Sequence, residues 1–150
     1  MKTKLSVNWN SVLKRYGIGS TVSGADEIAA WLSDDLAAGS RSIDHWIEIF
    51  RAVLSGERKA GYLGSGNAHH VRATERHVFL ECIFVDEMKV MMTLEQSMSV
   101  LESYRSFVSA DLNELGTTPE GFWVEYEKSG QEALNCYLST GFALGINVVD

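Results

Sequence analysis

The segment from Ala60 to Met92 alternates short stretches of β-branched and aromatic residues with turns of two to four residues. Antiparallel strands can be joined by turns this short, whereas a parallel pair needs a crossover of roughly a dozen residues. The spacing therefore predicts an antiparallel meander with strands at 60–63, 67–73, 77–85 and 88–92. The third stretch is apolar on both faces apart from Glu81, which predicts a central position in the sheet.

Amphipathic helices are expected before and after this meander in the sequence. Apolar residues recur at helical spacing in 23–39 and again in 42–56, and each segment ends at a glycine. Ser42 is placed to cap the second of these helices. Thr93 and Gln96 have the spacing of a capping box, so the longest helix is expected to begin there.

Four more features are predicted from the C-terminal third of the chain. The apolar stripe of the longest helix extends to Leu112, and the alternating residues 122–127 favour a strand. Ser129 and Glu132 suggest a second capping box that opens a short helix, and 146–149 could form an edge strand. Together these elements predict an α+β fold, an antiparallel β-sheet with helices packed mainly on one face.

The length and composition are those of a packed globule. The chain has 150 residues, of which 45% are hydrophobic, so a single domain spanning 1–150 can bury a sizeable core. Asn8, Asn10 and Lys14 interrupt any signal-peptide core, and no apolar stretch approaches the roughly 18 residues needed to cross a membrane. These features predict a cytoplasmic protein.

Charge is segregated along the chain. Residues 1–76 carry ten Lys and Arg against eight Asp and Glu, whereas residues 77–150 carry three against twelve, so the halves have net charges of +2 and −9. An acidic surface of this strength disfavours nucleic acid and anionic membranes and attracts basic proteins. The alternative is a solvated surface that only keeps the protein soluble.

The glycine cluster Gly61–Asn67 leads into a predicted strand and not into a helix. A phosphate-binding loop needs a helix N-terminus directly after its glycines, so this context excludes dinucleotide and P-loop sites and predicts a bulge or turn. Cys82 and Cys136 lie far apart without a metal-binding spacing, and they are expected to be reduced core thiols. We therefore expect no disulfide, metal or cofactor.

Histidines and carboxylates are the remaining candidates for chemistry. His69 and His70 are adjacent on a predicted strand and therefore point to opposite faces. With a turn centred near Glu75, His69 would face Glu81 across the hairpin, and Cys82 would lie on the other face. Such a pair could serve as a proton site or as part of a metal site, although no third ligand is evident. A plain polar strand face is the alternative.

The middle of the chain also carries a family resemblance. Gly61–Ala68 leads to a strand, Val78–Ile83 and Phe84–Glu87 follow, and then comes a helix that carries Leu94 to Phe107. This order resembles small bacterial immunity proteins of contact-dependent growth inhibition and related polymorphic toxin systems, over roughly residues 56–108. The resemblance implies a cytoplasmic antidote that binds and blocks one cognate toxin domain, commonly a nuclease, without catalytic residues of its own.

Charge and resemblance lead to the same expectation. Nuclease toxins bind polyanions with basic surfaces, and an acidic inhibitor complements such a surface. The expected partner-binding residues are acids of the second half together with two aromatic anchors. They are Asp86, Glu87, Glu95, Glu102, Glu120, Glu125 and Glu127, with Trp123 and Tyr126 as the anchors.

The leading hypothesis is thus an immunity protein that binds a basic toxin domain and neither nucleic acid nor membrane. A small enzyme around His69 and Glu81, or a non-inhibitory interaction domain, are the rivals. The sequence makes no prediction of oligomeric state.

Overall fold

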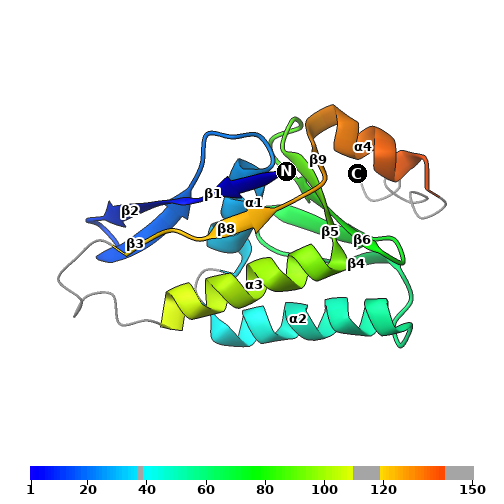
Figure 1. Ribbon diagram of the computed structural model, residues 1–150, viewed down its shortest axis with the longest axis horizontal. Coiled ribbons are helices and arrows are strands. Elements are labelled where there is room, and N and C mark those ends of the chain that lie inside the picture. The colour runs from blue at the N-terminus through cyan, green and yellow to red at the C-terminus, as the bar shows by residue number, and fades with distance from the viewer. Residues whose placement is uncertain (37–38, 110–118, 141–150) are drawn as a thin grey trace.

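The computed structural model describes residues 1–36, 39–109 and 119–140, and it has the predicted α+β architecture (Figure 1). Its centre is a five-stranded antiparallel sheet. In sheet order the strands are β4 (Gly61–Ser65), β5 (His69–Ala73), β6 (His77–Cys82), β7 (Lys89–Thr93) and β9 (Lys128–Ser129). The first four form the predicted meander, and β6 has the expected central position. The expected strand through Val85 is shorter than predicted, because β6 ends at Cys82.

Two small sheets involve N-terminal residues that the sequence pattern did not assign to strands. Strand β1 (Lys2–Lys4) pairs antiparallel with β8 (Trp123–Glu125), and β2 (Ser6–Asn10) pairs with β3 (Arg15–Gly19) as a hairpin. The predicted strand 122–127 is therefore shorter than expected and pairs outside the meander. The sequence pattern did not reveal the hairpin, because β2 is mostly exposed, β3 is mostly half-buried, and neither strand alternates with fully buried residues.

Four α-helices accompany these strands in the described residues. They are α1 (Ala25–Trp31), which continues into a π-helical segment (Leu32–Leu36), α2 (Ser40–Ser55), α3 (Leu94–Ser109) and α4 (Gly130–Leu138). Helix α2 stops at Gly56, whose φ of 83° is left-handed, as the sequence predicted. None of the described helices has the length and apolar character required to span a bilayer.

The predicted helix caps have mixed outcomes. The capping box at the start of α3 is confirmed, since the Gln96 amide donates to Thr93 Oγ1 (3.0 Å) and the Thr93 amide donates to Gln96 Oε1 (2.9 Å). The Ser42 cap is wrong, because α2 begins at Ser40 with Gly39 in the N-cap position. The second capping box is also wrong, because Ser129 makes no side-chain bond to α4. Its hydroxyl is instead 3.0 Å from the hydroxyl of Ser23.

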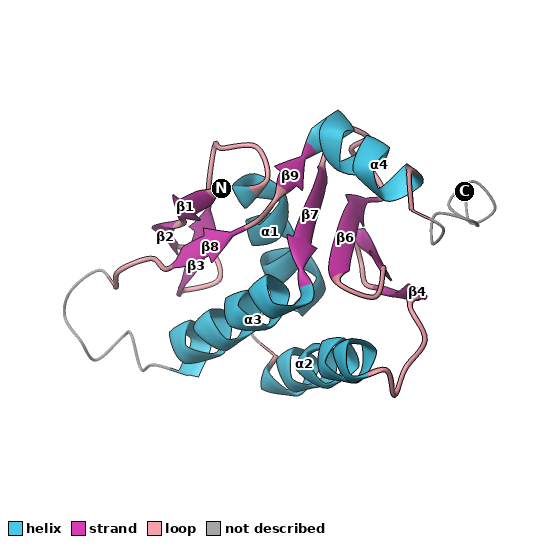
Figure 2. Ribbon diagram, turned by 45° about the vertical axis from the view of Figure 1, so that its right-hand side comes forward, coloured by secondary structure: helices cyan, strands magenta, loops and turns pink. Residues whose placement is uncertain are grey.

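The sheet buries its two faces against different helices. Val71, Leu80 and Met92 belong to the main core, which also includes residues of α1, α2 and α3. On the opposite face Phe79 stacks on Tyr137 of α4, with 4.7 Å between ring centroids. Helices α2 and α3 lie side by side and α4 lies apart from them (Figures 1 and 2), so the helices are mainly on one face, as predicted.

The glycine cluster forms the predicted β-bulge. The register of β4 against β5 shifts between Tyr62 and Gly64, and Gly64 has a φ of 146°, which side-chain-bearing residues rarely adopt. The expected end of the longest helix at Leu112 and the expected edge strand 146–149 lie outside the described residues.

Candidate functional site

Predicted partner-binding residues meet where β8 runs along the first turns of α3. Glu95, Ser99 and Glu102 are exposed and share one face of the helix. Ser99 also lines a groove of about 180 Å³, together with Trp123 and Glu125 of β8. We call Glu95, Glu102, Trp123 and Glu125 the α3–β8 face. Trp123 is 55% exposed on it.

Lysines of β1 partly neutralise this face. Lys4 lies 3.6 Å from Glu120, and Lys2 is the direct strand partner of Glu125, with its ammonium 5.7 Å from the centre of the Trp123 ring. Cations of the first half of the chain thus lie against acids of the second half, and the charge segregation of the sequence is only partly spatial. The two α3 acids have no cation within 4 Å in the described part of the chain, so their charges are not offset by an ion pair.

Tyr126 does not belong to any surface. It is fully buried, its hydroxyl donates to the Ser23 carbonyl oxygen (2.7 Å), and its ring packs so closely on Gly24 that a Cβ there would clash. The prediction of Tyr126 as a partner anchor is therefore wrong. Strand alternation explains why, since Val124 and Tyr126 point inward while Trp123 points to solvent.

The remaining predicted acids lie along β7 and at its far end. Asp86 and Glu87 are exposed in the β6–β7 turn, while α3 begins at the other end of β7. The five residues of β7 separate this turn from α3 by roughly 17 Å. Glu127 lies between, since its amide donates to the Met91 carbonyl oxygen (2.8 Å) in the middle of β7. The predicted acids therefore do not form one patch. One group lies at the β6–β7 turn and the other on the α3–β8 face, and Glu127 lies between them alongside β7.

The β6–β7 turn also exposes apolar side chains that sequence reasoning assigned to a buried strand. Ile83, Phe84 and Val85 are all exposed, and Phe84 is exposed to 76%. Beneath them Lys89 is buried, and its ammonium donates to the Asp86 carbonyl oxygen and lies 3.3 Å from Asp86 Oδ1. These charge-assisted contacts tie the Lys89 side chain to the turn.

The predicted pairing of His69 with Glu81 does not occur. His69 is paired with Cys82, and His70 is paired with Glu81. The β5–β6 turn is centred half a residue later than expected, and such a shift exchanges the faces of one strand relative to the other. His69 and Cys82 therefore share the main-core face, contrary to expectation, and Glu81 lies on the opposite face.

His69 belongs to a buried polar cluster that joins two elements. Its Nδ1 lies 3.3 Å from Asp35 Oδ1, and the Asp35 carboxylate also accepts the amides of Ala68 (2.9 Å) and His69 (3.1 Å). Asp35 thus fixes the β4–β5 turn to the π-helical segment. Burial raises the pKa of nearby Glu27 to about 7, against the opposing effect of the hydrogen bond from the Gly24 amide. These contacts give the cluster a structural role.

Glu81 is engaged by a different partner on the α4 side of the sheet. Arg72 Nη1 lies 3.1 Å from Glu81 Oε1 in a buried ion pair, and the Arg72 guanidinium lies 5.3 Å from the centre of the Tyr62 ring. His70 Nδ1 lies 2.5 Å from Ser65 Oγ. Within the described ranges no group of three His, Cys, Asp or Glu side chains is arranged to hold a metal ion.

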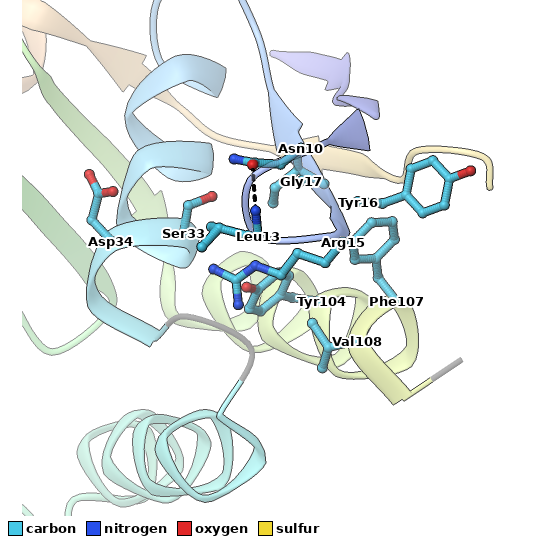
Figure 3. Close-up of a pocket in the computed structure, with 11 residues that line it drawn as sticks. Asn10, Leu13, Arg15, Tyr16, Gly17, Ser33, Asp34, Tyr104, Phe107 and Val108 are labelled. Carbon is cyan, nitrogen blue, oxygen red and sulfur yellow. Dashed lines mark hydrogen bonds between the residues drawn. The ribbon is translucent and has the colours of Figure 1, made fainter. Parts of the chain in front are cut away.

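A second groove, of about 320 Å³, lies between the β2–β3 hairpin and the C-terminal half of α3 (Figure 3). Arg15 extends along it toward Tyr104, and Phe107 lies beside Tyr16 at its other end. The tip of the hairpin is ordered by Asn10, whose Oδ1 accepts the Leu13 amide (2.9 Å). Sequence reasoning missed this groove because three distant segments build it. Its lining carries one cation, Arg15, and one acid, Asp34, so this groove lacks the excess of acids found on the α3–β8 face.

Comparisons of the chain with family models, with curated proteins and with solved structures return no match.

Proposed function

We propose that this protein is an immunity protein that binds a cognate toxin domain and neutralises it stoichiometrically, without turnover. The observation that carries the proposal is the α3–β8 face, where two unpaired acids of one helix lie beside a half-exposed tryptophan. The sequence resemblance supports the same function. The toxin domain is expected to be a basic nuclease.

The geometry of the α3 acids suits the attraction of a basic protein. Glu95 and Glu102 are two helical turns apart, or about 10 Å along the axis. This spacing is comparable to the Debye length of about 8 Å at physiological ionic strength, so their potentials overlap in solution. Such a field mainly accelerates association and selects against acidic partners, and it adds less to the final affinity.

Trp123 supplies the complementary apolar contact. Tryptophan is enriched among the residues that dominate binding energy when a partner excludes water from them. Here the Lys2 ammonium lies over the ring, and Trp123 lines the groove between β8 and α3. An acidic rim around an aromatic contact matches a partner surface that is built to hold phosphate backbones.

Co-expression with the product of the neighbouring reading frame tests the proposal directly. We expect that product to kill or arrest cells when it is expressed alone, and this protein to restore growth at about equal molar amounts. A neighbour that is harmless alone, or whose toxicity persists with this protein in excess, would contradict the proposal. A non-inhibitory interaction domain would bind the neighbour without restoring growth.

Association kinetics test the acidic mechanism. The double variant Glu95→Gln/Glu102→Gln should slow association with the purified toxin domain by about three- to tenfold at low salt, with convergence on the wild type at high salt. The matched control is Glu48→Gln/Glu57→Gln, which removes the same net charge around Arg51 at α2. Equal slowing in both double variants would mean that net charge, and not the α3–β8 face, is responsible.

The enzyme alternative rested on a pair that does not form. His69 and Glu81 lie on opposite faces of the sheet, and each has another partner, Asp35 and Arg72 respectively.

A further inference from the structure

The β6–β7 turn presents an apolar cluster in a place where turns are normally polar. Gly, Pro, Asn, Asp and Ser dominate turns because each favours the required backbone, whereas Ile83, Phe84 and Val85 offer no such advantage. Phe84 is the most exposed aromatic side chain in the described part of the chain, at 76%. Packing against the sheet or against α4 does not account for apolar residues at these solvent-exposed positions.

Hydrogen bonds tie this exposed turn to its surroundings. The Ile83 amide donates to the Ala68 carbonyl oxygen (2.7 Å), which ties the turn to the β4–β5 turn. The Met88 amide donates to the Val85 carbonyl oxygen (3.1 Å), which closes it. The buried ammonium of Lys89 contacts both the carbonyl oxygen and the carboxylate of Asp86. A side chain displayed on such a pre-organised turn loses little conformational entropy when it is captured.

We propose that Phe84 is the apolar anchor of the toxin interface and inserts into an apolar pocket of the cognate toxin domain whose rim carries Lys or Arg. This inference rests on the proposed function, and it identifies the side chain that contributes most to the affinity for the toxin domain. Asp86 and Glu87 directly follow the apolar run and point to solvent, so they face the cationic rim. Lys89 pairs with Asp86 at 3.3 Å, so Glu87 is the acid of this turn that has no ion-pair partner in the described part of the chain.

Charge distinguishes this turn from the exposed apolar residues at the tip of the β2–β3 hairpin. The tip of the β2–β3 hairpin exposes Val12 to 87% and Leu13 to 56%. Its flanking charges are Lys14 and Arg15, which repel a basic partner. The acidic turn therefore fits a nuclease toxin and the basic hairpin does not, which makes the hairpin a control of matched chemistry.

One partner is able to cover both the turn and the α3–β8 face. Gly130 lies against the Glu87 carbonyl oxygen, at 3.9 Å for an added Cβ, and Glu127 continues the same edge toward β8. The roughly 17 Å along β7 fits within a standard interface of about 800 Å² per partner, which is about 30 Å across. The α3 acids then govern association, and Phe84 governs dissociation.

Binding kinetics of the purified toxin domain with Phe84→Ala test this inference. We expect at least about a 30-fold weaker Kd, caused by faster dissociation and independent of salt. Val12→Ala, which truncates an even more exposed apolar residue, should change Kd by less than about twofold. Urea midpoints of both variants should equal that of the wild type, because both side chains lie outside the core.

A second variant tests whether the conformation of the turn matters in addition to the Phe84 side chain itself. Lys89→Met keeps the aromatic ring but removes the ammonium that holds Asp86, so it should weaken binding less than Phe84→Ala does. Glu87→Lys should slow association at low salt only. If Phe84→Ala and Val12→Ala bind equally well while the α3 double variant is slow, the proposed function stands and the anchor is refuted. A wild-type protein that binds no toxin overturns the proposed function first.

Discussion

Replacement of Glu27 by glutamine should remove the contribution of this side chain to the pH dependence of folding stability. Glu27 lies in the first turn of α1 and is only 5% exposed, and its carboxylate accepts the Gly24 amide. Burial raises its pKa from 4.5 to about 7, with a smaller contribution from the charge of Asp26 and an opposing one from the Gly24 bond. The folded state therefore holds this proton more tightly than the unfolded state does. Stability from this group is complete below the unfolded pKa and is lost as the pH rises through about 7.

The magnitude follows from the two pKa values of Glu27. A rise from 4.5 to about 7 corresponds to about 3 kcal/mol of unfolding free energy lost between low and high pH, at about 1.4 kcal/mol for each pH unit. Glu27→Gln retains an oxygen acceptor for the Gly24 amide and carries no charge at any pH. The variant should thus gain about 3 kcal/mol relative to the wild type between pH 4 and pH 8.5, or roughly 6–12 °C in Tm.

Urea denaturation of both proteins at half-unit steps from pH 4 to pH 8.5 measures this difference. Titration of all other groups is common to the two proteins and largely cancels when their unfolding free energies are subtracted. Glu132→Gln, at an exposed position in the first turn of α4, should show no pH-dependent difference from the wild type. A Glu27→Gln difference that stays constant across the whole pH range would refute the assignment of a buried, protonated Glu27.

Three further substitutions test the buried polar contacts. Asp35→Ala should cost about 3 kcal/mol of unfolding free energy, because it leaves buried N–H donors without an acceptor; a loss below about 1 kcal/mol in urea titrations would contradict this. Thr93→Ala should cost about 1 kcal/mol through the lost capping box, whereas Ser129→Ala should change stability by only a few tenths, and equal losses would argue against the observed caps. Arg72→Met should cost about 3–5 kcal/mol by stranding the Glu81 carboxylate, and adding Glu81→Leu should recover most of that loss in a double-mutant cycle.

Local features of the fold were predictable because they depend on residues close in sequence. The short turns between 60 and 92 required antiparallel strands, and Thr93 with Gln96 fixed the start of α3. Gly56 ended α2 and Gly64 produced the bulge, since each supplies a backbone conformation that other residues resist. Even so, the cap at Ser129 failed, because a distant serine, Ser23, contacts its hydroxyl.

The candidate site was less predictable because it depends on register and on pairing between distant segments. The centre of the β5–β6 turn lies half a residue later than predicted. As a result His69 and Glu81 lie on opposite faces of the sheet, where His69 contacts Asp35 and Glu81 pairs with Arg72. The alternation of 122–127 could have shown that Tyr126 faces inward with Val124, but not which residues it would meet. Phe84 looked like part of a buried strand, because apolar composition alone does not show where a strand ends.

The α+β class, the meander, the helix signals and a large excess of negative charge in the second half all follow from the order of the amino acids. The places where that charge can act on a partner depend on how distant segments pair in the fold. Pairing of β1 with β8 sets Lys2 and Lys4 against acids more than a hundred residues away, while the α3 acids and Glu87 of the β6–β7 turn have no ion-pair partner within the described residues. The physical reason is that charges interact across space, through distances that chain order does not specify.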